Sequence, residues 1–136
     1  MPILKIYRGL PGSGKTTLAN KEGTIVLSPA DMYSMRNGKY QWCREYSKKG
    51  HVWSNKILEL TMEEGIDITI AEVLPKEKSM RHYFNMAKKY NYKVEVIDCK
   101  ADIDTSYKRN VHNVPMEHIK GMSEVWEDWD DIKERL

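Results

Sequence analysis

The sequence predicts an α/β fold with a central parallel sheet of four to five strands, and three observations support it. Short β-rich runs alternate with longer helical stretches over the 136 residues. No repeat, linker or low-complexity segment interrupts this alternation. The octapeptide GLPGSGKT at residues 9–16 separates the first β-rich run from the first helical stretch. Because strands joined by crossover helices lie parallel, their carboxyl ends should meet at one edge of the sheet, where ligands bind.

Each element is expected from its residue pattern. The predicted strands are the β-rich runs at 3–7, 24–27, 66–71 and 93–98. Helices are expected after the octapeptide, over 42–64 with an interruption or bend near Gly50 and an end at Gly65, from Pro75 to about residue 90, and over 102–110 and 115–132. A chain of this length is large enough to bury a core, so residues 1–136 are expected to form a single domain.

Composition restricts the class of protein. The chain is 40% hydrophobic and 31% charged, and no apolar run approaches the ~20 residues that span a membrane. Residues 1–8 are too short and too polar for a signal peptide. Cys43 and Cys99 stand far apart without metal-ligand spacing, so both are expected to be reduced thiols. These features favour a cytoplasmic protein without a disulfide or a zinc site.

The octapeptide matches the phosphate-binding loop pattern G-x-x-x-x-G-K-[ST] at every constrained position. Its glycines allow backbone N–H groups to surround a triphosphate at close range. Lys15 would place a positive charge on the β- and γ-phosphates, and the Thr16 hydroxyl would bind the Mg²⁺ that bridges them. The pattern therefore predicts a site for ATP and Mg²⁺. The expected nucleotide-binding residues are Gly9, Leu10, Pro11, Gly12, Ser13, Gly14, Lys15, Thr16 and Thr17.

Two acidic residues follow the predicted strands that neighbour the loop. Asp31 comes after the second strand, where a carboxylate can orient and deprotonate a hydroxyl that attacks the γ-phosphate. Its alternative role is an N-cap, since Asp is common directly before a helix. Glu72 ends the third strand, where it would serve the metal ion or stand as a surface glutamate.

Charge is unevenly distributed, although the net charge is only +2. Residues 36–56 contain six basic side chains and one acid, with Tyr40, Trp42 and Tyr46 among them. Cations with interleaved aromatic rings are typical of surfaces that neutralise phosphates and stack bases, but a solvated helix face gives the same pattern. Residues 122–136 contain six acidic and two basic side chains, a pattern that favours a solvent-exposed helix surface.

Several further segments are distinctive. They are RGLPGSGKT at 8–16, ADMY at 30–33, GKYQW at 38–42, HVW at 51–53, RNVHNVP at 109–115 and the residues Ile119, Met122, Trp126 and Glu127. In these segments the chain resembles the P-loop kinases related to the kinase domain of phage polynucleotide 5′-hydroxyl kinase, which include short proteins often labelled AAA-type ATPases. The family patterns are A-D-D-Y, G-x-Y-x-F, A-H-x-W, R-N-x-H-G-V-P and I-x-x-M-x-x-x-[WY]-E. The resemblance covers nearly the whole chain.

The resemblance implies a fold, a reaction and a set of roles. The fold would be a three-layer P-loop kinase with a short helical lid over about residues 102–116. Asp31 would be the general base, Lys15 would contact the phosphates, and Arg109 would reach them from the lid. Without the resemblance, Arg109 is simply a cation near a helix C-terminus. The implied reaction is ATP-dependent transfer of a phosphoryl group to a hydroxyl of DNA or RNA, either a 5′-OH end or a hydroxymethylated base.

Two departures from the family pattern concern the acceptor side. Met32 replaces the second acid of A-D-D-Y, and Glu72-Val73-Leu74 replaces the family's D-[NT]-[TN]. Both changes remove hydrogen-bonding groups, so substrate choice or rate is expected to differ from the family norm. The alternatives are a kinase for nucleosides or metabolites, a nucleotide-hydrolysing switch, and a non-catalytic adaptor.

Overall fold

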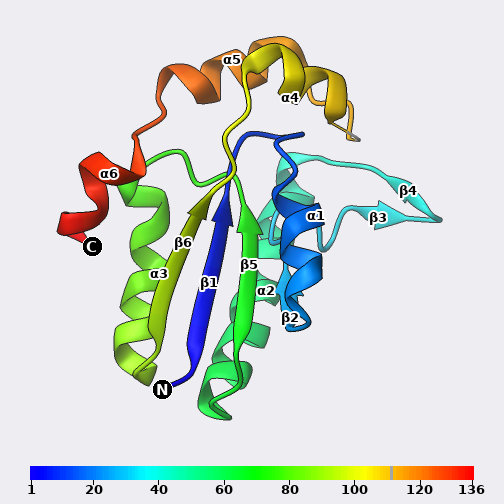
Figure 1. Ribbon diagram of the computed structural model, residues 1–136. Helices are drawn as coiled ribbons and strands as arrows, with labels where there is room; N and C mark the ends of the chain where they lie inside the picture. Colours follow the sequence, from blue (N-terminus) through cyan, green and yellow to red (C-terminus); the bar gives the residue numbers. More distant parts are fainter. Residues whose placement is uncertain (111) are drawn as a thin grey trace.

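The centre of the molecule is a four-stranded parallel sheet in the order β2-β5-β1-β6 (Figure 1). The computed structural model describes residues 1–110 and 112–136. The strands are β1 (Ile3–Arg8), β2 (Ile25–Leu27), β5 (Ile68–Glu72) and β6 (Lys93–Asp98). This arrangement confirms the predicted α/β fold. Both ends of each strand lie within two residues of their expected positions.

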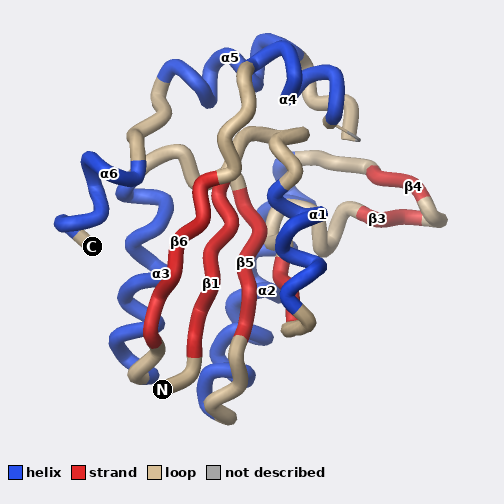
Figure 2. The backbone as a smooth tube through the Cα atoms, in the orientation of Figure 1, coloured by secondary structure: helices blue, strands red, loops and turns tan. Residues whose placement is uncertain are grey.

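Helices cover both faces of the sheet, which gives three layers (Figure 2). The helices are α1 (Lys15–Ala19), α2 (Arg44–Glu63), α3 (Glu77–Tyr90), α4 (Ile103–Arg109), α5 (Met116–Glu124) and α6 (Trp129–Ile132), with short 3-10 turns at Asn20–Glu22 and Lys133–Arg135. Leu4 and Ile6 of β1 share the larger core with Leu58 of α2 and Met80 of α3. Successive strand residues point to opposite faces, so Tyr7 packs with Ala19 of α1 on the other side.

The strands all point toward the edge of the sheet above which α4 and α5 lie (Figure 1). The loops that follow β1, β2, β5 and β6 also gather there, as expected for ligand sites in open α/β sheets. None of the described helices is both long and apolar enough to cross a membrane. Cys43 and Cys99 are free thiols, and Cys99 is buried.

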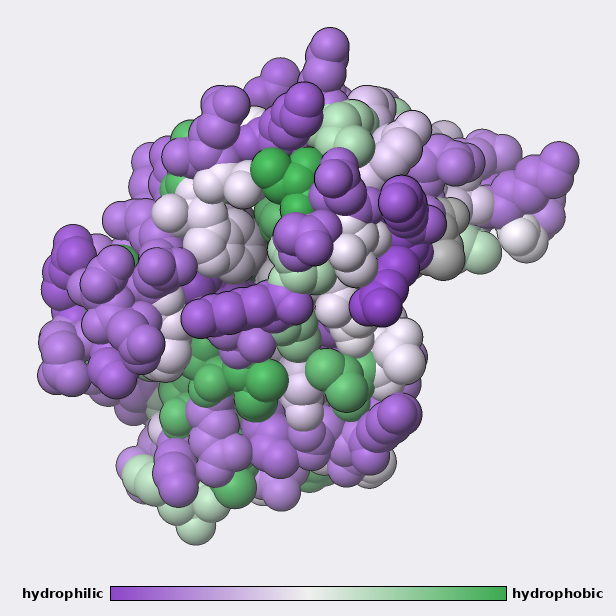
Figure 3. Space-filling view, turned by 45° about the horizontal axis from the view of Figure 1, so that its top comes forward, coloured by the Kyte–Doolittle hydropathy of each residue, from purple (hydrophilic) through white to green (hydrophobic). Residues whose placement is uncertain are grey.

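A hairpin between β2 and α2 was not predicted. It consists of β3 (Met35–Arg36) and β4 (Lys39–Tyr40), which pair antiparallel. The two-residue turn is Asn37-Gly38, and both residues have positive φ, as an Asn-Gly hairpin turn requires. The hairpin projects from the body of the molecule (Figures 1 and 2), and its surface is mainly hydrophilic (Figure 3).

The interruption expected near Gly50 is wrong, because α2 is one continuous helix from Arg44 to Glu63. Gly50 is buried instead, and it lies against the carbonyl group of Pro29 in the turn after β2. The helix begins at Arg44 rather than Trp42, because the Cys43 thiol accepts a hydrogen bond from the Tyr46 N–H at 3.5 Å and caps it.

The predicted helix over 115–132 is divided into α5 and α6. The backbone groups of Glu127, between the two helices, form hydrogen bonds with residues outside both helices. The N–H of Glu127 donates to the carbonyl oxygen of Pro75 at 2.8 Å, and the carbonyl oxygen of Glu127 accepts from Arg8 at 2.7 Å. Helical hydrogen bonds therefore cannot continue through this point.

Candidate active site

The octapeptide forms the loop between β1 and α1, and Lys15 is the first residue of the helix. The Lys15 ammonium donates to the carbonyl oxygen of Leu10 at 3.4 Å. Burial lowers the pKa of Lys15, and the negative charges of Asp31 and Glu72 partly oppose this effect. Both predicted acids thus lie within electrostatic range of the loop lysine, as the strand order required.

The predicted lid segment lies directly against the loop at Gly12. A Cβ built on Gly12, whose φ is +80°, would collide with the carbonyl oxygen of Ser106 in α4 and with the backbone nitrogen of Asn110. Only glycine allows this approach. The hydroxyl groups of Ser13 and Ser106 are buried without a hydrogen-bond partner among the described residues. Unpaired buried hydroxyls beside an N–H-rich loop are groups that a bound polar ligand would satisfy.

Asp31 lies in a turn rather than at a helix start, since the next helix begins at Arg44. The N-cap alternative is therefore wrong. One carboxylate oxygen of Asp31, Oδ1, accepts a hydrogen bond from the Tyr40 hydroxyl at 2.9 Å. The other, Oδ2, lies 3.6 Å from Nε2 of His112. The Tyr40 and His112 rings are stacked with their centroids 3.6 Å apart. Hairpin and lid thus meet at this carboxylate.

Burial and the neighbouring Asp31 charge raise the pKa of the Tyr40 hydroxyl, which therefore remains a hydrogen-bond donor at neutral pH. The Nδ1 atom of His112 is buried and has no hydrogen-bond partner among the residues described. Neither Tyr40 nor His112 was assigned to the site from the sequence, although both lie in segments that resemble family patterns. Their contact with Asp31 depends on the packing of the His112 ring on the Tyr40 ring of the hairpin.

Glu72, at the end of β5, has hydrogen bonds at both carboxylate oxygens. Oε1 lies 2.8 Å from Nε2 of His51, and Oε2 accepts from the Tyr83 hydroxyl at 3.1 Å. The hydrogen bond to Glu72 raises the pKa of His51 above its ordinary value of 6.5. Within residues 1–110 and 112–136 no cluster of three or more His, Cys, Asp or Glu side chains is arranged to hold a metal ion. The metal role of Thr16 and Glu72 stays a prediction.

Arg109 is the last residue of α4, and its side chain is exposed. In the part of the chain that the structure describes, it forms no ion pair with an acidic side chain. Its neighbour Asn110 touches Gly12 through the backbone, so the end of α4 lies at the phosphate-binding loop. Val111, inside the predicted lid segment, lies outside the described residues. The lid role of Arg109 stays a prediction.

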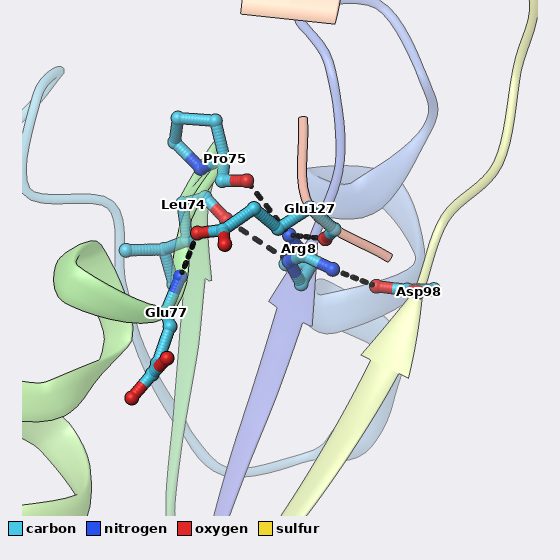
Figure 4. A network of polar contacts seen from close by, with 6 residues as sticks. All are labelled: Arg8, Leu74, Pro75, Glu77, Asp98 and Glu127. Atoms are coloured by element: carbon cyan, nitrogen blue, oxygen red, sulfur yellow. Dashed lines mark hydrogen bonds and ion pairs between the residues drawn. The ribbon is translucent and has the colours of Figure 1, made fainter. Parts of the chain in front are cut away.

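A buried arginine organises the base of the site, and the sequence prediction gave it no role. Arg8, the last residue of β1, has no exposed surface, and its guanidinium group donates to four oxygens (Figure 4). These are the carbonyl oxygens of Leu74 (2.9 Å), Pro75 (3.1 Å) and Glu127 (2.7 Å), and Oδ1 of Asp98 (3.2 Å). The group also lies 4.3 Å from the centre of the Trp126 ring. The sequence did contain a signal for this role, because Arg8 is a charged residue at the end of a strand that was expected to be buried.

The Arg8 network joins the ends of three neighbouring strands to the segment between α5 and α6. The side chain of Glu127 extends the network, since its Oε1 accepts from the N–H of Glu77 at the start of α3, at 2.9 Å (Figure 4). Leu74 adopts φ +50°, which is uncommon for a non-glycine residue, and its carbonyl oxygen is the acceptor for Arg8 Nε. This network accounts for the Trp126-Glu127 pair in the family-like segment.

A cationic and aromatic cluster lies at the base of the hairpin. Tyr33 is its centre, with the Arg36 guanidinium 4.1 Å and the Lys49 ammonium 5.2 Å from its ring centroid. Tyr46 and Trp53 pack on the same ring, with centroids at 5.3 and 4.7 Å. Trp53 is 53% exposed, so an aromatic face remains open to solvent. Of the predicted basic and aromatic stretch, Arg36, Tyr46 and Lys49 belong to this cluster. Tyr40 contacts Asp31 and His112 instead.

The fold and the loop define a P-loop kinase-like domain. The chain belongs to the AAA domain family, because a family model with that description matches residues 4–132.

Human NEDD4-binding protein 2 is 31% identical over 140 residues, a match that covers 92% of this chain and 8% of that protein. Human YLP motif-containing protein 1 is 26% identical over 154 residues, which covers 92% of this chain and 7% of that protein. The chain thus spans less than a tenth of the length of these curated relatives.

Similar folds occur among solved structures. A chain of the Pnkp1/Rnl/Hen1 RNA repair complex has a TM-score of 0.76 at 16% identity, covering 99% of this chain and 46% of that one. A putative kinase from Chloroflexus aurantiacus has a TM-score of 0.60 at 21% identity, covering 79% and 64%. A gluconokinase from Sinorhizobium meliloti 1021 has a TM-score of 0.56 at 14% identity, covering 94% and 77%. At these identities the likeness concerns the fold.

Proposed function

We propose that residues 1–136 act as one kinase domain, with a lid over about residues 102–116, that transfers the γ-phosphate of ATP to a hydroxyl of a nucleic acid. The observation that carries this proposal is the position of Asp31. Its carboxylate lies within electrostatic range of Lys15, and the chain leads from it into the cationic and aromatic cluster around Tyr33. A base and a surface for a polyanion therefore belong to one continuous segment.

In the proposed reaction, the acceptor hydroxyl attacks the γ-phosphorus while the bond from that phosphorus to the β–γ bridging oxygen breaks. The acceptor proton passes to Asp31. The Tyr40 hydrogen bond to Oδ1 keeps the carboxylate oriented, and the proton would go to Oδ2, which lies 3.6 Å from Nε2 of His112. Lys15 exchanges the Leu10 carbonyl oxygen for phosphate oxygens, and Arg109 neutralises charge on the transferred group.

The residues present fit a nucleotide, since no atom lies within 4 Å of a Cβ built on Gly14 in the loop, and Ser13 offers an unpaired hydroxyl. They also fit Mg²⁺, which favours oxygen ligands and keeps several waters. When bound, Mg²⁺ would neutralise phosphate charge. Thr16 would hold it directly, and Glu72, whose two oxygens are already hydrogen-bonded, would hold it through water.

The test offers ATP labelled at the γ-phosphate together with oligonucleotides that carry a 5′-OH, a 3′-OH or a hydroxymethylated base, and with free nucleosides. Label transfer to an oligonucleotide is expected. Asp31→Asn should abolish transfer and leave ATP binding intact, and Lys15→Ala should reduce transfer by about a hundredfold or more. Transfer only to nucleosides, or ATP hydrolysis without any transfer, would contradict the proposal.

Salt provides a second test, because a nucleic acid held by Arg36 and Lys49 releases counterions when it binds. The apparent affinity for the oligonucleotide should fall steeply between low and moderate salt, whereas the affinity for ATP should change less. The affinity for a small-molecule acceptor would not fall steeply with salt concentration.

A further inference from the structure

His112 lies between the hairpin and Asp31, and the reaction described above gives its nitrogen atoms no part. Its ring stacks on the Tyr40 ring, with the centroids 3.6 Å and the planes 23° apart. Its Nε2 atom lies 3.6 Å from Oδ2 of Asp31. The side chains of His112 and Asp31 are 33% and 35% exposed, so a ligand can reach both groups from solvent.

The segment that carries His112 is held against the donor side of the site. Asn110 lies against Gly12 of the phosphate-binding loop. Its side-chain oxygen accepts a hydrogen bond from the Val114 N–H at 2.8 Å, and its side-chain amide donates to the carbonyl oxygen of Tyr107 at 2.8 Å. These contacts, together with the stacking on the hairpin, hold the imidazole in position between the loop and the base.

The surroundings of the two ring nitrogens favour the tautomer of His112 that carries its proton on Nε2. Nδ1 is buried and has no hydrogen-bond partner among the described residues, and a buried N–H group without an acceptor is costly. Nε2 faces a carboxylate oxygen, which attracts an N–H group and repels a nitrogen lone pair. His112 therefore presents a hydrogen-bond donor to the side of Asp31 that Tyr40 leaves free.

The Nε2–H group and the carboxylate oxygen face each other without closing a hydrogen bond. Their separation of 3.6 Å is longer than the ordinary N–H···O distance of about 2.7–3.2 Å. A hydroxyl oxygen can lie about 2.8 Å from each atom, because twice that distance exceeds their separation. In this position the hydroxyl accepts a hydrogen bond from Nε2 of His112 and donates its own hydrogen to Oδ2 of Asp31.

We infer that His112 is a further catalytic residue, whose Nε2–H group holds the oxygen of the acceptor hydroxyl beside Asp31. The inference rests on the proposed kinase activity, and it applies to any acceptor that reacts through a hydroxyl. During transfer the acceptor oxygen forms its bond to the γ-phosphorus, the bond to the bridging oxygen breaks, and the acceptor proton moves to Oδ2. His112 keeps its own proton throughout, and its contribution is to orient the attacking oxygen.

The experiment measures phosphoryl transfer, ATP affinity and thermal melting for three variants. His112→Phe keeps a ring that can stack on Tyr40 but removes Nε2. It should lower kcat by about threefold to tenfold, the value of one hydrogen bond, with little change in ATP affinity or melting temperature. His112→Ala should be at least as slow. His118→Phe is the matched control, because His118 is exposed on α5, and it should react like the unchanged protein.

Free imidazole separates a role of the nitrogen atom from a role of ring packing. His112→Ala leaves space beside Tyr40 in which imidazole can bind, so added imidazole should restore part of the transfer and reach saturation. It should not restore transfer by His112→Phe, whose ring fills the same space. A normal rate for His112→Phe, or no response of His112→Ala to imidazole, would overturn the inference and leave the kinase proposal standing.

A failure of the proposed function gives a different result. Transfer only to nucleosides would contradict the nucleic-acid acceptor, whereas a slow His112→Phe variant with a nucleoside would still support the role of His112. ATP hydrolysis without transfer to any acceptor would overturn both proposals, because no acceptor hydroxyl would then take part.

Discussion

The carbonyl oxygen of Pro29 lies against the backbone of Gly50, where a Cβ on residue 50 would collide with it. The turn that carries Asp31 is therefore packed against the middle of α2. Glycine in a helix normally costs about 0.5–1 kcal/mol relative to alanine. At this position the close packing outweighs that cost.

Gly50→Ala is therefore expected to destabilise the domain by about 1–3 kcal/mol, the usual cost of inserting an atom into a packed site. It should also lower phosphoryl transfer, because Pro29 and Asp31 share one turn. Gly121→Ala is the control, since Gly121 lies on α5 with no atom within 4 Å of a built Cβ. That variant should gain up to about 1 kcal/mol from helix propensity. Urea unfolding of both variants provides the comparison, and equal effects would contradict the packing argument.

Tyr40→Phe should lower the transfer rate by about tenfold, the value of one hydrogen bond to a charged group. The Tyr40 hydroxyl donates to Asp31, so its loss leaves the carboxylate less well oriented. Affinity for ATP should not change, because the Tyr40 hydroxyl donates its hydrogen bond to Asp31 and not to the loop that binds phosphate. Single-turnover kinetics and ATP binding would be measured together. A normal rate would show that the hydrogen bond has no part in the reaction.

Arg8→Lys should destabilise the domain by about 2–4 kcal/mol, although the charge is kept. A lysine ammonium cannot reach the four oxygens that the planar guanidinium group serves, so buried carbonyl groups would lose their partners. Arg81→Lys is the control, because Arg81 is exposed and pairs with Glu77 on the surface of α3. Chemical denaturation should show little change for it. Similar losses for both variants would argue against the network.

Arg109→Ala should reduce kcat with little effect on stability. Arg109 is exposed at the end of α4, and α4 lies on Gly12 of the loop, so we expect the side chain to reach a bound phosphate. Lys108→Ala removes the neighbouring exposed charge and serves as the control. If both variants lost activity equally, the effect would be one of general charge and not of a specific lid residue.

The pair of His51 and Glu72 should make stability depend on pH. The hydrogen bond to Glu72 raises the pKa of His51 in the folded state above 6.5. The contribution of this pair to the free energy of unfolding is therefore fully present below about pH 6.5, where His51 is charged in both the folded and the unfolded state. As pH rises through the folded pKa, the folded state loses a proton that the unfolded state has already released, and the contribution is lost. Melting temperatures of the unchanged protein and His51→Gln should therefore converge as the pH rises above this range. A constant difference would contradict this prediction.

Local patterns predicted much of the molecule. The strands, the loop and the start of α1 depend on residues that are neighbours in sequence, and their positions were expected within two residues. The hairpin was missed although Asn37-Gly38 is a strong turn signal, because its strands are only two residues each. An interruption or bend at Gly50 was expected from helix propensity alone, because the packing of Gly50 against Pro29 is not visible in the local sequence.

The sequence determined that the chain has a phosphate-binding loop on a parallel α/β sheet, because that loop needs only eight consecutive residues between a strand and a helix. Tertiary structure decided which side chains surround the loop. Arg8 and Glu127 are 119 positions apart, and Asp31 meets His112, which lies 81 positions further along the chain. Such contacts depend on how crossover helices return the chain to one edge of the sheet. Hydrogen bonds and packing between distant segments, and not local propensity, therefore set the acceptor side of the site.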